Sequence, residues 1–228
     1  MSNQIEDAIA AAENAAQNMG ENTAVTTQTA QGGALANAGG AVDMSLGSFL
    51  KSGGISPDKW IQVKDTGLKL DKNEKAAIEE FEGTIDFANV KLFQGLRVSL
   101  PGNKYEYIKT YDGKTESRSG QNWNAAVADA NARAQSPNTP YRGADILIVL
   151  DNDVKQGGTT IPAGTKLGYT TSITGFGAFQ SFLGTLVNEG KVQIGAGDTL
   201  SGEVKTKVIH ETKKNADYEW GILNFEPA

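Results

Sequence analysis

The 228-residue sequence contains no cysteine and a single histidine, His210. Without cysteine there can be no disulfide, no thiolate zinc site and no cysteine nucleophile. No GxSxG or GxxxxGK[ST] motif indicates a hydrolase nucleophile or a phosphate-binding loop. We therefore expect no enzymatic activity, no metal and no cofactor, and we interpret His210 as a structural residue within a strand.

Basic residues are absent from the first fifty positions, and large apolar residues are scarce there. This segment carries five acidic residues, whereas the rest of the chain has 21 basic and 22 acidic residues. We expect a low-complexity, flexible acidic arm at 1–43, in which the alanines of 3–20 favour a short helix. A single β-rich domain should follow at 44–228. The net charge of -6 excludes a protein that coats DNA through bulk positive charge, but not one with a local basic groove.

Long hydrophobic runs are also missing. No window approaches the ~18 apolar residues that cross a bilayer, and the N-terminus lacks the basic start and apolar core of a signal peptide. The sequence therefore predicts a soluble protein with no membrane partner. We expect it in the cytoplasm, or in a particle assembled there.

Short strand-like runs separated by turn signals occupy the chain from Trp60 onward. Segments 84–93 and 95–100 suggest a strand pair, and 204–214 with 218–226 suggest a hairpin. Helical patterns occur at 73–81, 123–133 and 177–188. The pattern predicts an α+β domain, mainly antiparallel β: an OB-like barrel or a sandwich with two or three short helices.

The stretch KYEYIKTY, 104–111, carries the most informative pattern. If it is a strand, its period of two places four side chains on one face: Tyr105, Tyr107, Lys109 and Tyr111. Lys114 and Arg118 follow in the next loop. Aromatic and basic residues interleaved in this way are typical of single-strand binders, where stacking contributes about 1–3 kcal/mol per base. The alternative is that the tyrosines form the inner face of a sheet, and the pattern alone leaves both open.

A second basic strand contains Lys205 and Lys207, opposite the predicted strand with Tyr218 and Trp220. These lysines either contact phosphates or protect an edge strand from aggregation. We include both in the predicted nucleic-acid-binding set.

The Ala/Gly/Gln-rich leader, the cysteine-free β domain and the aromatic ending YEWGILNFE resemble small bacteriophage-encoded proteins. The resemblance implies either single-stranded-DNA binding in replication or recombination, or a structural role. Our leading hypothesis is sequence-independent binding of single-stranded nucleic acid. The alternative is a virion or assembly protein that self-associates, or binds partner proteins, through residues 1–55.

Overall fold

The computed structural model describes residues 54–196, 199–216 and 218–228. The predicted acidic arm, 1–43, and the first ten residues of the predicted domain lie outside this part of the chain. The described residues are mainly β, and nearly all of the strand pairs are antiparallel. This confirms the predicted mainly antiparallel α+β class.

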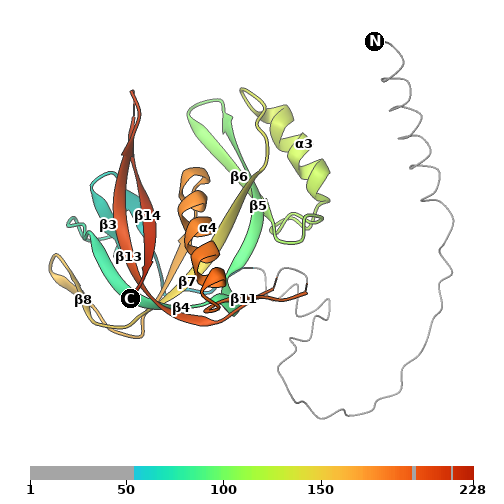
Figure 1. The fold of residues 1–228 in the computed structure, drawn as a ribbon. Coiled ribbons are helices and arrows are strands. Elements are labelled where there is room, and N and C mark those ends of the chain that lie inside the picture. The colour runs from blue at the N-terminus through green and yellow to red at the C-terminus, as the bar shows by residue number, and fades with distance from the viewer. Residues whose placement is uncertain (1–53, 197–198, 217) are drawn as a thin grey trace, which may run out of the picture. The chain divides into compact units, whose positions relative to one another are not determined.

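The largest sheet has eight strands and branches at its central strand β7 (Figure 1). One edge of β7 pairs with β10, and the other pairs with β5 at residues 141–145 and with β4 at 148–150. One branch continues from β4 to β13 and β14, and the other from β5 to β6. The strands are β1 Lys59–Trp60, β4 Glu80–Asp86, β5 Lys91–Leu100, β6 Lys104–Thr110, β7 Tyr141–Leu150, β10 Lys166–Thr170, β13 Glu203–Lys214 and β14 Glu219–Pro227.

Short hairpins and two helices complete the described structure. The hairpins are β2 Gln62–Lys64 with β3 Gly67–Lys69, β8 Val154–Gln156 with β9 Thr159–Ile161, and β11 Gln193–Ile194 with β12 Leu200–Ser201. A 3-10 turn, η1 Phe87–Asn89, separates β4 from β5. The helices are α3 Trp123–Arg133, capped by Asn122, and α4 Ile173–Asn188, capped by Ser172. Both caps accept backbone N–H groups of the first turn, which otherwise lack partners.

The inner face of the sheet forms the core, and the sheet curves around α4 (Figure 1). Alternate residues of β7 point inward, and Ile146 and Ile148 are fully buried there. From α4, Phe179 stacks on Phe87 and meets Phe225 edge to face. A smaller cluster lies where α3 covers the same face of β5 and β6, around Trp123. Both helices therefore lie on the inner face, which leaves the outer face of β5, β6 and β7 without a covering helix in the described chain.

The hairpin predicted at the C-terminus is confirmed as β13 and β14, and the helix at 123–133 is confirmed as α3. The predicted pairing of 84–93 with 95–100 is wrong. β4 and β5 follow one another along β7, because η1 only bends the chain between them and both segments pair with the same edge.

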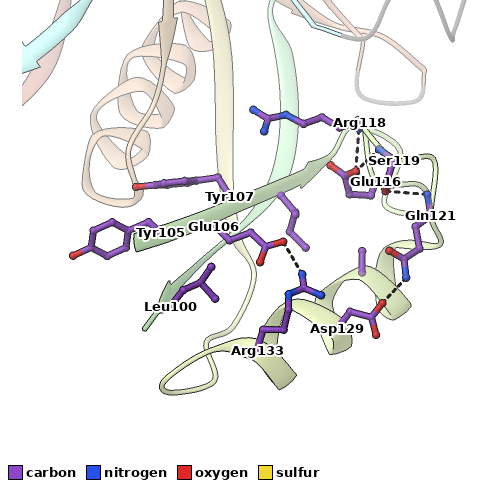
Figure 2. A pocket seen from close by; sticks show the side chains of 12 residues that line it. Leu100, Tyr105, Glu106, Tyr107, Glu116, Arg118, Ser119, Gln121, Asp129 and Arg133 are labelled. Carbon is purple, nitrogen blue, oxygen red and sulfur yellow. Dashed lines mark hydrogen bonds and ion pairs between the residues drawn. The ribbon is translucent and has the colours of Figure 1, made fainter. Parts of the chain in front are cut away.

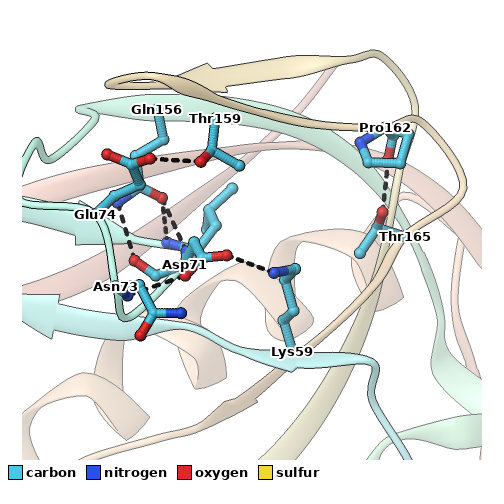
Figure 3. Close-up of polar contacts among 9 residues, drawn as sticks. Lys59, Asp71, Asn73, Glu74, Gln156, Thr159, Pro162 and Thr165 are labelled. Atoms are coloured by element: carbon cyan, nitrogen blue, oxygen red, sulfur yellow. Dashed lines mark hydrogen bonds and ion pairs between the residues drawn. The ribbon is translucent and has the colours of Figure 1, made fainter.

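The predicted helix at 73–81 is also wrong. Ile78 bridges to Leu68, and residues 80–81 already belong to β4. The reason is tertiary: the side chain of Gln156, which is fully buried, accepts the N–H groups of Leu70 and Asp71 and donates to the carbonyl of Ala76. Figure 3 shows Gln156 beside Asp71. These bonds hold 70–77 in an irregular loop despite its helix-forming residues.

We expect Gln156→Ala to lower the free energy of unfolding by about 2–4 kcal/mol, since it leaves several buried backbone groups without a partner. Urea unfolding measures the change. Gln121→Ala is the matched control, because the exposed Gln121 side chain makes one bond, to Asp129. An equal effect for the two variants would contradict the role given to Gln156.

Among the helices in the described residues, none combines the length and apolar character needed to cross a membrane.

Candidate nucleic-acid interface

The outer faces of β5, β6 and β7 carry a group of aromatic and basic side chains that we call the aromatic face. Strand register places them on one side of the sheet, since Arg97 lies opposite Tyr107, and Gly95 opposite both Lys109 and Tyr141. The aromatic face consists of Phe93, Arg97, Tyr105, Tyr107, Lys109, Tyr111 and Tyr141.

Tyr105 and Tyr107 are the most accessible part of the aromatic face. Their exposed fractions are 53% and 50%, so they do not form a core. The Arg97 guanidinium lies 4.1 Å from the centre of the Tyr105 ring and 5.5 Å from that of Tyr107. These cation–π contacts hold the three side chains together in one exposed cluster.

Phe93 and Tyr141 form a more buried second row, and two glycines make room for them. A Cβ atom at Gly143 would come within 2.3 Å of the Phe93 ring, and one at Gly95 within 3.0 Å of both rings. The two rings meet edge to face, with 6.3 Å between their centroids. Burial and the nearby Tyr107 raise the pKa of the Tyr141 phenol. This row lies beside the exposed tyrosines on the same face of the sheet.

Lys109 and Tyr111 point along the same face but are held by Asp145 of β7. The Lys109 ammonium and the Tyr111 hydroxyl each lie 2.6 Å from Asp145 Oδ2. Thr170 of β10 donates to Oδ1 at 2.7 Å. Burial, followed by the bond to Asp145, raises the pKa of Tyr111 well above its usual range. The structure therefore places both predicted residues on the aromatic face, but Lys109 already has a carboxylate partner.

The loop after β6 carries the predicted residues Lys114 and Arg118, both exposed. Asp112 accepts two backbone N–H groups and the Thr110 hydroxyl; although burial opposes ionisation, these bonds lower its pKa to about 2. Glu116 accepts three more bonds in the same loop, and its pKa is likewise lowered against the effect of burial. Figure 2 shows Arg118 extending on the side of β6 where Tyr107 lies.

A cleft of about 710 Å³ lies at the edge of β6, between this strand and α3 (Figure 2). Tyr105, Tyr107 and Arg118 line it together with residues of α3. An ion pair crosses it, with Arg133 of α3 donating to Glu106 at 2.7 Å. In the described chain β6 pairs with β5 alone, so it is an edge strand of the sheet beside this cleft.

Lys205 and Lys207 are not brought to the aromatic face. Register places Lys205 on the outer side of β13, level with Thr84 of β4 and Val149 of β7. Val149 lies four residues from Asp145, about 13 Å along the strand. Lys207 pairs with Glu80 at 2.9 Å, and this bond raises its pKa. The predicted set therefore divides into one group at β6 and two lysines elsewhere on the sheet.

Three residues of the aromatic face escape the sequence pattern: Phe93, Arg97 and Tyr141. Arg97 could have been found from the sequence, because Pro101, Gly102 and Asn103 form a turn signal. That turn fixes the hairpin register, which sets Arg97 opposite Tyr107. The left-handed backbone of Gly102 and Asn103 forms that turn. Tyr141 had no such signal, since it follows a proline-rich segment and joins the site only through β7.

The electrostatic character of this region differs from that of the chain. Residues 91–122 contain six basic and three acidic side chains, a net charge of +3 in a protein of net charge -6.

Comparison with protein-family models, curated proteins and solved structures finds no match to this chain.

Groups of three or more His, Asp or Glu positioned to hold a metal ion are absent from the described residues. His210 instead joins strands, with Nε2 2.7 Å from the carbonyl oxygen of Lys64 in β2.

Proposed function

We propose that this protein binds single-stranded nucleic acid, without sequence preference, on the aromatic face. The observation that carries the proposal is the exposed cluster of Tyr105, Arg97 and Tyr107, on a face of β5 and β6 that no helix of the described residues covers. Every base has a π-face, so stacking on tyrosine or arginine tolerates any sequence. In a duplex the bases stack on one another, and these rings would have no free partner.

The strand geometry favours an extended ligand. Tyr105 and Tyr107 are two residues apart on one face of β6, which corresponds to about 6.8 Å. Neighbouring bases in B-DNA are separated by about 3.4 Å along a strand. Bases stacked on both tyrosines are thus farther apart than in a helix, so the bound strand is unstacked between them.

Phosphate contacts come from the cations that border the tyrosines. Arg97 is on the face itself, Arg118 extends beside Tyr107, and Lys114 lies in the same loop as Arg118. The acidic remainder of the chain makes this small basic area the favourable region for a polyanion. Binding should accordingly be weakened by salt.

OB-like single-strand binders also present aromatic residues beside basic ones on a curved sheet. This likeness of the binding surface supports the OB-like alternative of the predicted fold. The sheet itself is open in the described residues, with β1 and β14 at its ends.

The assembly alternative rests on residues 1–55, and no contact among the described residues favours it. A role in replication or recombination is what the resemblance to phage-encoded proteins implies, and the proposed activity agrees with it.

The test is fluorescence anisotropy of a labelled mixed-sequence 20-mer and of its duplex, at 50 and 200 mM salt. We expect the single strand to bind and the duplex to bind much more weakly. With about three phosphate contacts, the affinity for the single strand should fall about 20-fold between the two salt concentrations. Equal binding of the duplex, or no binding of the single strand at 50 mM salt, would refute the proposal.

A further inference from the structure

The most unusual group on the outer face is a buried carboxylate beneath the predicted binding surface. Asp145 is 1% exposed and lies in the middle of the sheet, on β7. Its two oxygens accept from side chains of two other chain segments: Lys109 and Tyr111 at the end of β6, and Thr170 of β10. A buried charge persists only when it is paired and hydrogen-bonded in this way.

The three partners of Asp145 differ in what they need from it. The hydroxyl groups of Tyr111 and Thr170 can donate or accept, so either can bond a neutral amide. The ammonium of Lys109 can only donate and carries the charge that balances the carboxylate. The carboxylate therefore acts specifically on Lys109: it pairs with the ammonium, which also lies 5.2 Å from the centre of the Phe93 ring and 5.1 Å from that of the Tyr111 ring.

We propose that Asp145 sets how many phosphates the aromatic face engages, by holding the charge of Lys109 in an ion pair. This inference rests on the proposed function. Lys109 follows Tyr105 and Tyr107 on the same face of β6, so without its partner it would lie in line with a strand stacked on the tyrosines. Arg97 has no carboxylate partner within salt-bridge distance among the described residues, which leaves it available to the ligand. Asp145 is a positioning residue that touches no ligand.

The test uses the full chain with Asp145→Asn, Lys109→Met and the double variant. Anisotropy with a labelled dT 20-mer is measured from 50 to 400 mM salt. Each phosphate contact adds about −0.7 to the slope of log K against log salt. We expect Asp145→Asn to steepen the slope by about 0.7 and to tighten binding about fivefold at 0.1 M salt. Lys109→Met alone should weaken binding without steepening the slope, because it leaves the Asp145 carboxylate without its cation. The double variant should return the slope to the original value, because the released ammonium is then absent.

Asp71→Asn is the matched control, because Asp71 holds Lys59 at the same 2.6 Å distance away from the aromatic face. It should not change the slope. If Asp145→Asn leaves the slope unchanged or weakens binding, the carboxylate is merely structural and the inference fails. If the unsubstituted protein binds no single strand, the proposed function itself fails.

Acetylation of lysines in the unsubstituted protein, followed by mass spectrometry, tests the ion pair without any ligand or variant. Lys109 should react several-fold more slowly than Lys104, its exposed neighbour on β6. Equal reactivity of the two lysines would overturn the inference even if Asp145→Asn does not fold.

Discussion

Replacing both exposed tyrosines, as Tyr105→Ala with Tyr107→Ala, should weaken binding of a single-stranded 20-mer by about 30-fold or more. Each base stacked on an aromatic residue contributes about 1–3 kcal/mol, and the lower bound for two bases corresponds to that ratio. Each single variant should show a loss of about fivefold or more. Arg97 loses its ring partners in the double variant, so the two losses need not add. Anisotropy at 50 mM salt measures all three.

Tyr218→Ala serves as the matched control for the tyrosine variants. Tyr218 is 73% exposed but lies between β13 and β14, away from β6. Its removal should change neither the affinity nor the stability. Thermal unfolding of each variant verifies that the fold persists, because exposed tyrosines contribute little to the core. Equal affinity for the double variant and for Tyr218→Ala would show that the aromatic face does not bind the strand.

The second large effect concerns stability: Phe179→Ala should reduce the free energy of unfolding by about 3–5 kcal/mol. Phe179 is fully buried and contacts the rings of Phe87 and Phe225. It joins α4 to η1 and to β14, so truncation opens a cavity between three elements. Guanidinium or urea unfolding measures the loss.

Ile173→Ala is the control on the same helix, since Ile173 is the first residue of α4 and is 55% exposed. We expect a change within about 0.5 kcal/mol for this variant. Where Phe179→Ala stays folded, its affinity for a single strand should be unchanged, because α4 lies on the inner face. A small loss of stability for Phe179→Ala, similar to that of Ile173→Ala, would contradict the assigned core.

The local patterns of the sequence predict most strands and both helices of the described chain. Period-two alternation identifies β6, and the apolar stripe of Phe179, Phe182 and Leu186 identifies α4. The incorrect helix at 73–81 has a clear cause: its local propensity was overridden by Gln156, more than seventy residues away. Likewise, β4 and β5 pair with β7 and not with each other, which local pattern does not reveal.

Of the candidate site, the sequence predicts only the residues that lie along the single strand β6 and the loop that follows it. Sequence alternation gives the common face of Tyr105, Tyr107, Lys109 and Tyr111 but not its exposure, which depends on which side the helices cover. The neighbours Phe93 and Tyr141 join the face through strand pairing, which is a long-range property. Local sequence patterns also do not predict the buried partner of Lys109, since Asp145 lies 36 residues farther along the chain. For the same reason, the placement of Lys205 and Lys207 far from the tyrosines follows only from the sheet order.

The central claim is that single strands stack on the aromatic face, and photocrosslinking tests it most directly. A single-stranded oligonucleotide carrying 5-iodouracil is irradiated in complex with the full chain, and the modified peptides are identified by mass spectrometry. We predict crosslinks at Tyr105 and Tyr107, lost on competition with unlabelled single strand and absent at Tyr218. Crosslinks confined to other surfaces, such as β13 with Lys205 and Lys207, or no crosslink at all, would contradict this account.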